Sequence, residues 1–544
     1  MRRSLAALWH GLWLNRQQQS LLTVTLSLAT SLWLWLEGGR VLDVESLQNL
    51  WRSTHHPQTL FEHLLAPLAG VFFTFCFAPW PLGALAVVPL AVLFALWQHP
   101  TRQHPLRDAW LFALAHLGSG LYWVYISLYH FGGAPLPFAI LANVLLVLYL
   151  ALYPLLAAWL MRRLSAPGSW RRTLLIPLLW TGGELVRAYL FTGFPWLAAG
   201  YSALHTPLDG LAPIGGVFLV SFALTLVASL LARAVVLRQG KPLAIAVALY
   251  AAASATSLIA HTTPSGAPFS VALIQGNIEQ STKFDPALME RHLQDYIALA
   301  LAREEAVVIL PETAFTFMEE QMTRDLAQLN AYFKERGQTL VSGIPAGDLK
   351  KQLFYNAIIT LGDGKGRYYK HHLLPFGEYV PLRSWLSIFE KYVEIPYSNF
   401  ERGEAKQPPL MTGKYRAGAS ICYEAAFGRD MRQALPEADY LINISNDAWF
   451  KDSIAADQHL QMNQMRSREL GREMARATND GITVLLDARG RIKARISRFV
   501  REVLVGEIQP YQGITPYARL GNALIFALLA LYAAALVAMR RRLA

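Results

Sequence analysis

The chain has 544 residues, of which 53% are apolar and only 16% are charged. Soluble domains carry about 25% charged residues on average, so an ordinary soluble enzyme is disfavoured, and disorder, a collagen-like fibre and a coiled coil are excluded. The net charge of +11 could indicate nucleic-acid binding, but many basic residues sit in short loops or ends beside long apolar runs. That distribution is typical of a membrane protein facing an anionic leaflet, and no nucleic-acid partner is expected.

The apolar runs predict a bundle of membrane-spanning helices. A helix needs about 20 mostly apolar residues to cross a bilayer core of about 30 Å. The eight predicted core spans are 60–77, 82–97, 109–128, 138–160, 174–190, 216–236, 243–259 and 520–539. Basic loops at 162–172 and 238–241 and the basic tail at 540–542 indicate cytoplasmic segments. The stretch after the seventh span is therefore expected on the outer side.

The composition changes after residue 260, where shorter apolar runs alternate with helical patterns and predict an α/β domain. Strands are expected at 269–275, 306–311, 339–344, 355–361, 417–422, 440–445 and 482–486. Helices are expected at 286–303, 318–336 and 454–478. We divide the chain into an N-terminal extension (1–59), a transmembrane domain (60–260), the α/β domain (261–516) and a last span with a basic tail (517–544).

The N-terminal extension holds one further apolar segment, residues 20–36, and its charges leave two topologies open. Arg2 and Arg16 favour the cytoplasm, whereas Arg40 follows the segment. Either the segment does not fully cross the membrane, or the N-terminus lies outside. We expect it to be retained, because no small-residue cleavage site follows it.

Three ionisable residues stand at or just after the ends of strand-like runs: Glu312, Lys370 and Cys422. A thiolate is a nucleophile, a nearby cation lowers the pKa of the thiol, and a carboxylate can accept its proton. The ammonium can also stabilise the oxyanion that forms when the thiolate attacks a carbonyl. Alone, each residue has an ordinary structural explanation, as a buried thiol or a solvated charge. The combination predicts nucleophilic chemistry.

In this order the three motifs resemble the Glu-Lys-Cys triad of the nitrilase, or carbon–nitrogen hydrolase, superfamily. The chain is most similar to its membrane branch, the apolipoprotein N-acyltransferases. Further matching segments lie at 192–196, 274–277, 355–356, 370–381, 421–424, 443–450, 477–482 and 515–519. The resemblance runs from about residue 60 to the C-terminus. It implies an extracytoplasmic α-β-β-α sandwich inserted into a polytopic helical membrane domain of about eight spans.

The resemblance also implies roles for particular residues. Cys422 would be the nucleophile, Glu312 the general base and Lys370 the oxyanion stabiliser. The residues that would support or line the site are Glu378, Asn356, Tyr423, Glu424, Phe284 and Trp449. Phe284 stands where the family often has tryptophan, so an aromatic ring is kept and the indole N–H is lost.

The implied reaction moves a fatty acyl chain from a phospholipid to Cys422 as a thioester. The chain then passes to the α-amine of the diacylglyceryl-modified N-terminal cysteine of an apolipoprotein. The implied location is the bacterial inner membrane, with the catalytic domain on the periplasmic side. A monomer without cofactor is expected.

Two other functions fit part of the pattern. Water could resolve the thioester, which would make the chain a membrane-tethered amidase. The spans could instead form a transporter or scaffold, but they hold few ionisable residues, mainly Glu184 and Arg187, which could pair at their i,i+3 spacing.

Three remaining features are interpreted as structural. No metal site is expected, since the adjacent pairs at 55–56 and 371–372 cannot turn both histidines toward one ion from a regular element. The glycines at 362–366 predict a hairpin turn rather than a phosphate loop. The apolar residues at 385–389 and 392–397 predict either a membrane-dipping arm or an amphipathic helix packed on the core.

Overall fold

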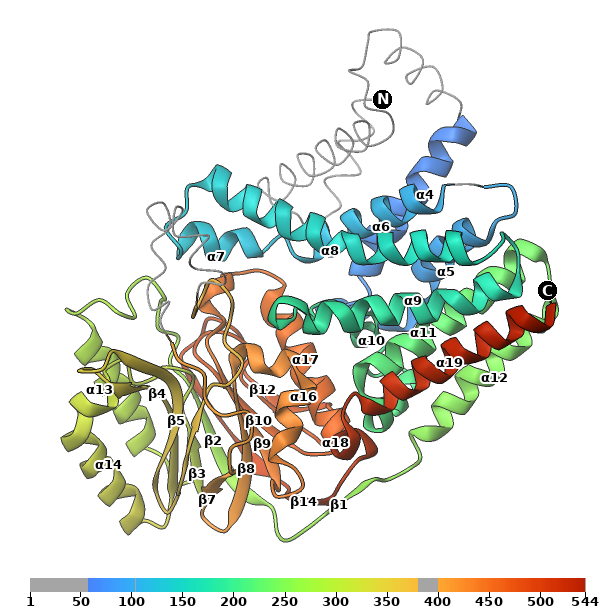
Figure 1. Ribbon diagram of the computed structural model, residues 1–544. Helices are drawn as coiled ribbons and strands as arrows, with labels where there is room; N and C mark the ends of the chain where they lie inside the picture. The colour runs from blue at the N-terminus through green and yellow to red at the C-terminus, as the bar shows by residue number, and fades with distance from the viewer. Residues whose placement is uncertain (1–56, 103, 380–399, 544) are drawn as a thin grey trace.

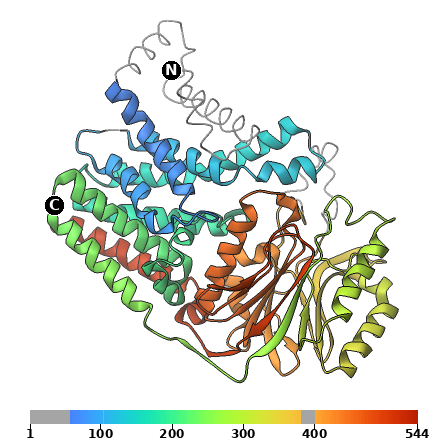
Figure 2. The same ribbon diagram turned by 180° about the vertical axis from the view of Figure 1, so that it is seen from behind.

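The structure is a computed structural model that describes residues 57–102, 104–379 and 400–543 of the chain. A bundle of helices lies beside an α/β body, and the two views agree on this arrangement (Figures 1 and 2). The predicted apolar segment at 20–36 and the predicted arm at 385–397 lie outside the described residues.

Each of the eight predicted core spans coincides with a helix, or, for 109–128, with the bent pair α6 and α7. The helices of this part are α4 (Pro57–Thr74), α5 (Val87–Gln98), α6 (Pro105–Gly120), α7 (Val124–His130), α8 (Leu136–Leu164), α9 (Trp170–Tyr189), α10 (Ala199–Ser202), α11 (Ala212–Leu237), α12 (Gly240–Thr256) and α19 (Ala523–Leu543). Within the described ranges α8, α9 and α11 are long and apolar enough to cross a membrane, and α6 with α7, bent by 48°, would make a fourth. The helices are compatible with a membrane protein, and the span count of eight stays a prediction.

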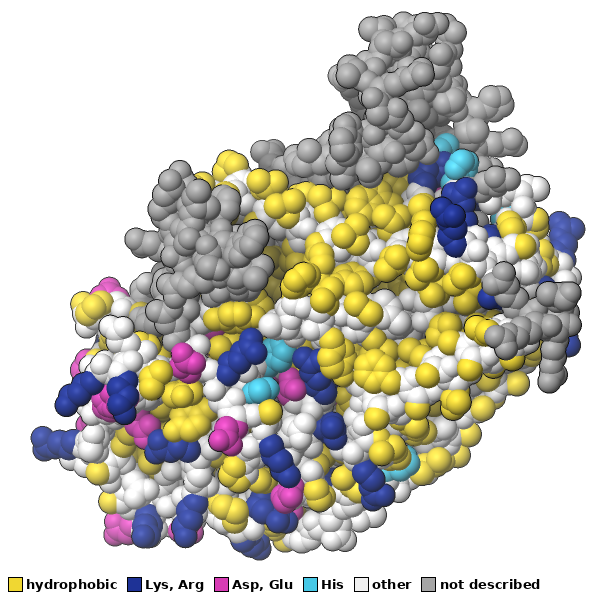
Figure 3. All heavy atoms as spheres, in the orientation of Figure 1, with side chains coloured by type: hydrophobic (Ala, Val, Ile, Leu, Met, Phe, Trp, Pro, Cys, Tyr) yellow, Lys and Arg dark blue, Asp and Glu magenta, His cyan; other side chains and the backbone are white. Residues whose placement is uncertain are grey.

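Helix α8 presents an apolar face to the outside. Leu141, Leu145, Leu152 and Leu156 are spaced by four and seven residues, so they share one face, and each is about half exposed. In the most apolar 18-residue stretch of α8, only 28% of the residues are buried. In the corresponding stretch of the segment that contains α11, 72% are buried. Apolar side chains gather over the helical part and charged ones over the α/β part (Figure 3). An apolar surface of this kind suits hydrocarbon rather than water.

The α/β part holds two six-stranded sheets in its described residues, ordered β13-β2-β3-β4-β5-β6 and β12-β11-β10-β9-β8-β7. The first sheet comprises β2 (Phe269–Gln275), β3 (Val307–Ile309), β4 (Thr339–Asp348), β5 (Leu353–Gly362), β6 (Arg367–Tyr369) and β13 (Glu502–Ile508). The second comprises β7 (Leu410–Thr412), β8 (Tyr415–Ile421), β9 (Tyr440–Ser445), β10 (Met474–Thr478), β11 (Val484–Leu486) and β12 (Ile492–Arg495). The antiparallel pair β1 (Thr262–Pro264) and β14 (Tyr511–Gly513) brings the two ends of this part together, and α18 (Pro516–Leu520) then leads to α19.

The sheets pack face to face with helices on both outer faces. On β2, Leu273 enters the core shared with Ile442 of the other sheet, whereas Ile274 packs with α13 (Met289–Leu301) and α14 (Thr323–Glu335). Helices α16 (Gly428–Met431) and α17 (Ala455–Leu470) cover the second sheet on the side of the helical part (Figure 1). Both faces of each sheet are covered, which explains the nearly continuous apolar runs of the central strands. The expected α-β-β-α sandwich is confirmed.

All seven predicted strands are present, and the glycines at 362–366 join β5 to β6 as a hairpin, as predicted. The predicted helix at 454–478 is wrong after residue 470. Helix α17 ends at Leu470, Gly471 takes a left-handed conformation with φ of 62°, and residues 474–478 form β10 between β9 and β11. A left-handed glycine ends a helix, and here it starts the return of the chain into the sheet.

This turn gives a test of the fold. A Cβ at Gly471 would lie 2.7 Å from the side chain of Thr262, whereas Gly337, with φ of 63°, has open space around it. We expect Gly337→Ala to lower the free energy of unfolding by about 1–2 kcal/mol through backbone strain alone. Gly471→Ala should cost about 1–3 kcal/mol more because of the overlap. Denaturant unfolding of both variants in detergent measures the difference, and equal losses would contradict the packing described.

Candidate active site

Cys422 stands where β8 ends and a turn of 3-10 helix, Cys422–Ala426, begins. Its φ is 51°, a left-handed conformation that residues with a side chain rarely adopt and that costs about 1–3 kcal/mol. Cys422 as a whole residue is partly exposed, whereas Ile421 and Tyr423 on either side are buried. The chain therefore places a free thiol at the edge of the packed core.

Lys370 lies buried between two carboxylates. It follows β6, and its Nζ is 2.9 Å from Glu378 Oε1 and 3.4 Å from Glu312 Oε1. Asn356, on β5, donates from Nδ2 to the same two oxygens, at 2.9 Å and 2.7 Å. The structure thus joins four of the predicted site residues in one hydrogen-bonded cluster, which fixes the ammonium in position.

Glu312 also links the first sheet to the second. Its Oε2 accepts from the backbone N–H of Asn446, directly after β9, at 3.0 Å. Lys283 donates from Nζ to the backbone carbonyl of Glu312 at 3.0 Å, and burial lowers the pKa of Lys283 to about 8 although the Glu312 carboxylate opposes the shift. The half-buried Phe284 follows Lys283 directly, so this predicted residue borders the segment that holds Glu312.

Glu424 joins the segment of Lys370 to the strand of Cys422. Its donors are the backbone N–H groups of Ile421 (2.7 Å), His371 (2.8 Å) and His372 (3.0 Å) and the hydroxyl of Tyr368 (2.9 Å). Burial raises the pKa of Glu424 to about 7, against the effect of these backbone donors. Because it accepts these four hydrogen bonds, the carboxyl group of Glu424 holds the segment after Lys370 against the end of β8.

Tyr423 and Trp449 connect the α/β part to the helical part. The Tyr423 hydroxyl donates to the carbonyl of Gly193 at 3.0 Å, and Gly193 has φ of 98° with no room for a Cβ. The Trp449 carbonyl accepts from Ser127 Oγ of α7 at 2.8 Å, and its ring meets Phe131 edge-on at 5.5 Å. Trp449 therefore sits at the junction with α7, outside the cluster around Lys370.

The charges around Cys422 determine how its thiol can react. Burial and the Glu312 carboxylate raise the pKa of the Cys422 thiol far above its usual range, against the opposing effect of Lys370. Burial alone would lower the pKa of Lys370, but the carboxylates of Glu378 and Glu312 outweigh it, and the pKa is raised. At neutral pH the thiol is protonated and the amine is charged. A thiolate then forms only as a base removes the proton, next to a fixed cation that can stabilise an oxyanion.

A second buried cluster, which the sequence analysis missed, adjoins Cys422. The carboxylate of Asp447 accepts from Ser445 Oγ (3.0 Å), His459 Nδ1 (2.9 Å) and Arg476 Nη2 (2.8 Å). Burial would raise the pKa of Asp447, but Arg476 and His459 outweigh it and hold the pKa well below its usual range. His459 and Arg476 fell in the predicted helix at 454–478, where no pattern separated them from other polar residues of that segment.

Two residues of this cluster and Cys422 are of types that can bind a metal ion. One candidate ligand atom each from Cys422, Asp447 and His459 lie within 4.8 Å of one another, which is close enough for a cation site. Both nitrogens of His459 already face hydrogen-bond acceptors, and the Asp447 carboxylate already accepts three hydrogen bonds. A guanidinium at 2.8 Å from that carboxylate would also repel a cation. These side chains do not fit a metal, and no step is assigned to one.

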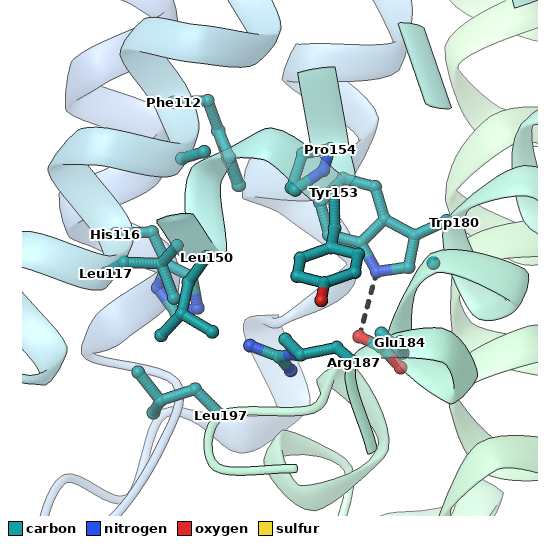
Figure 4. Close-up of a pocket in the computed structure, with 12 residues that line it drawn as sticks. Phe112, His116, Leu117, Leu150, Tyr153, Pro154, Trp180, Glu184, Arg187 and Leu197 are labelled. Carbon is teal, nitrogen blue, oxygen red and sulfur yellow. Dashed lines mark hydrogen bonds between the residues drawn. The ribbon is translucent and has the colours of Figure 1, made fainter. Parts of the chain in front are cut away.

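A cavity of about 30 Å³ lies inside the helical part, between α6, α8 and α9 (Figure 4). This is room for about two water molecules. Glu184 accepts from Trp180 Nε1 at 3.0 Å and from the backbone N–H of Ala199 at 2.8 Å, while Arg187 points into the cavity. These two charged residues, both in the described part of the chain, do not form the ion pair that their spacing allowed.

The fold and the Lys370 cluster define the class: a carbon–nitrogen hydrolase domain joined to a membrane-type helical part. The family model described as carbon-nitrogen hydrolase matches residues 270–516. The model described as the apolipoprotein N-acyltransferase N-terminal domain matches residues 69–230.

The curated relatives identify the branch. An apolipoprotein N-acyltransferase from Azotobacter vinelandii is 42% identical over 84% of this chain and 91% of its own length. One from Methylococcus capsulatus is 39% identical over 84% and 92%, and one from Haemophilus influenzae is 35% identical over 90% and 97%. The chain belongs to the apolipoprotein N-acyltransferase family.

Two solved structures show weaker likeness. A carbon–nitrogen hydrolase from Helicobacter pylori is 16% identical, with a TM-score of 0.32 over 44% of this chain and 89% of its own. An amidase from Nesterenkonia is 18% identical, with a TM-score of 0.34 over 48% and 95%. At these values the likeness carries no inference about activity.

The reactivity of Cys422 tests the electrostatic description. We expect iodoacetamide to alkylate Cys422 slowly at pH 7 and faster as the pH rises, because the raised pKa keeps the thiol protonated. Glu312→Gln removes an anion that raises this pKa and should speed alkylation at pH 8 by roughly tenfold, whereas Lys370→Met should slow it by a similar factor. Cys422→Ala, which leaves only the buried Cys76, corrects for background. Rate changes of the same sign in both variants would contradict the description.

Proposed function

We propose that the chain transfers a fatty acyl group from a phospholipid to Cys422, and from there to the α-amine of the S-diacylglyceryl N-terminal cysteine of an apolipoprotein. The observation that carries the proposal is the buried cluster of Lys370 with Glu312 and Glu378, whose segment Glu424 joins to the strand end before the free Cys422, in a chain of this family. The names of the relatives support the acceptor.

In the first half-reaction Glu312 takes the proton of the Cys422 thiol as Sγ attacks the ester carbonyl of the phospholipid. The ammonium of Lys370 stabilises the resulting oxyanion. The tetrahedral intermediate collapses, the C–O bond breaks, and the lysophospholipid alkoxide leaves with the proton held by Glu312. A thioester remains on Cys422.

In the second half-reaction the acceptor amine attacks the thioester carbonyl, and Glu312 takes a proton from the nitrogen. The C–S bond breaks, the thiolate regains the proton, and the amide product leaves. Glu378 and Asn356 keep Lys370 and Glu312 in place throughout, and Tyr423 and Glu424 hold the segments around the nucleophile. Phe284 and Trp449 are proposed to line the approach of the substrates.

The proposed setting is the bacterial inner membrane. Residues 60–260 and 517–544 would supply eight spans, and residues 261–516 would form the periplasmic catalytic domain of a monomer. The outward apolar face of α8 and the basic loops support this topology. The amidase alternative, with water as acceptor, is less supported, because the N-terminal match covers residues 69–230 and the relatives matched over nine tenths of their length are named as acyltransferases.

Intact mass tests the first half-reaction. Purified full-length protein is incubated with phosphatidylethanolamine micelles and washed with or without neutral hydroxylamine. We expect a hydroxylamine-labile acyl increment on the wild type and on Cys76→Ser, and none on Cys422→Ala. Glu312→Gln should slow its formation by about 10²–10⁴-fold, the usual contribution of a general base. An increment that survives in Cys422→Ala would contradict the proposed nucleophile.

Cysteine labelling tests the topology. Lys350→Cys lies in an exposed turn of the α/β part, and Gln239→Cys in an exposed loop between α11 and α12. With Cys422→Ala in both, we expect a membrane-impermeant maleimide to label the first and not the second in intact spheroplasts. Both should be labelled after lysis. The reverse order would place the catalytic domain in the cytoplasm and contradict the proposed side.

A further inference from the structure

We propose that His459 is a positioning residue, which holds the backbone of the nucleophile Cys422 in its reactive conformation through a hydrogen bond from Nε2–H. The inference rests on the proposed function for the role of Cys422, and it adds a residue that stands outside the predicted Glu-Lys-Cys set. Helix α17 supplies the side chain, and the 3-10 turn that follows β8 supplies its partner.

The contact itself fixes the position of one hydrogen. His459 Nε2 lies 2.9 Å from the backbone carbonyl oxygen of Cys422. A carbonyl oxygen only accepts, so Nε2 carries the hydrogen and donates.

The other edge of the ring is fixed by Asp447. His459 Nδ1 lies 2.9 Å from Asp447 Oδ1, and Arg476 Nη2, 3.2 Å from Nδ1, lies closer to Asp447 Oδ2, at 2.8 Å. The side chains of His459, Asp447 and Arg476 are each at most 1% exposed. A Cβ at Gly481 would lie 2.3 Å from Asp447 Oδ2, so the cluster also leaves no room beside the carboxylate. The ring has one orientation available.

Cys422 requires such support because its backbone is strained. A φ of 51° is unfavourable for a residue with a side chain, so the surroundings must hold it. The direction of Sγ follows from that backbone conformation. A donor on the Cys422 carbonyl therefore acts on the thiol through the peptide, without touching the reacting atoms.

The same geometry separates His459 from a general base. In a cysteine–histidine pair an imidazole nitrogen accepts the thiol proton. Here Nε2 faces a carbonyl and Nδ1 faces a carboxylate, so both nitrogens are already committed to acceptors. Proton removal from Cys422 is left to Glu312, and His459 contributes orientation.

Two isosteric variants isolate the contact. In His459→Gln the amide nitrogen can take the place of Nε2 and still donate to the Cys422 carbonyl. In His459→Asn the shorter amide can take the place of Nδ1, toward Asp447, and leaves the Cys422 carbonyl without this donor. Both variants lose the ring, so a general loss of packing would affect them alike.

The measurement is the single-turnover acylation of Cys422 in the full-length protein, with two probes: phosphatidylethanolamine micelles and the activated ester p-nitrophenyl butyrate. We expect His459→Asn to lower the acylation rate constant by about 10- to 100-fold, as a buried carbonyl loses a donor, and His459→Gln to stay within about fivefold of the wild type. The half-saturating concentration of either probe should change by less than about twofold, because the contact orients the thiol and does not bind the donor.

Equal rate constants for the two variants, or a shift confined to the half-saturating concentration, would overturn the inference. If the His459→Asn protein does not accumulate, the acylation rate constant of His459→Gln is the test. A value within about fivefold of the wild type supports the inference, and a larger loss overturns it. A wild type acylated by the activated ester but not by the phospholipid would refute the proposed donor. The order of the variants on the ester would still decide the role of His459.

Discussion

The ammonium of Lys370, buried between the carboxylates of Glu378 and Glu312, is the charge on which the site depends. Moving an ion out of water costs several kcal/mol of hydration free energy. The three charges are therefore stable in the interior only because they interact with one another. Glu312 follows β3, whereas Lys370 and Glu378 both lie in the segment after β6, and Asn356 adds donors from β5 between them. Because removal of Lys370 would leave two buried carboxylates without a cation, the ammonium that serves the reaction also stabilises the fold around it.

The helical part shares its interior with the nucleophile. Gln458 Oε1 on α17 accepts from Trp196 Nε1 of the helical part at 2.7 Å, and the next residue, His459, donates to the carbonyl of Cys422. Tyr423 belongs to the same buried apolar cluster as the helices. One turn of α17 therefore contacts both parts of the molecule. A displacement of one part relative to the other would shift the hydrogen-bond donor of the Cys422 carbonyl.

The sequence predicted well what depends on local pattern and poorly what depends on distant partners. Apolar runs predicted the central strands and the helices and placed Glu312, Lys370 and Cys422 at or just after strand ends, and the resemblance supplied their roles. Strand β10 was assigned to a helix, because its alternating small and polar residues are compatible with a helix as well as with a strand. Only Gly471 indicates where the helix ends. His459 was missed, since its partners lie elsewhere in the sequence and a single histidine in a polar helix carries no signal.

At Cys422 the side chain that the reaction needs is not the one that suits the left-handed backbone best. Glycine adopts that conformation without steric strain, whereas cysteine brings the sulfur atom at the expense of a strained backbone. A chain carrying Cys422→Gly would lose this steric strain together with the packing of the thiol on the core, and it could not form a thioester. It would be a convenient form in which to trap the intact phospholipid.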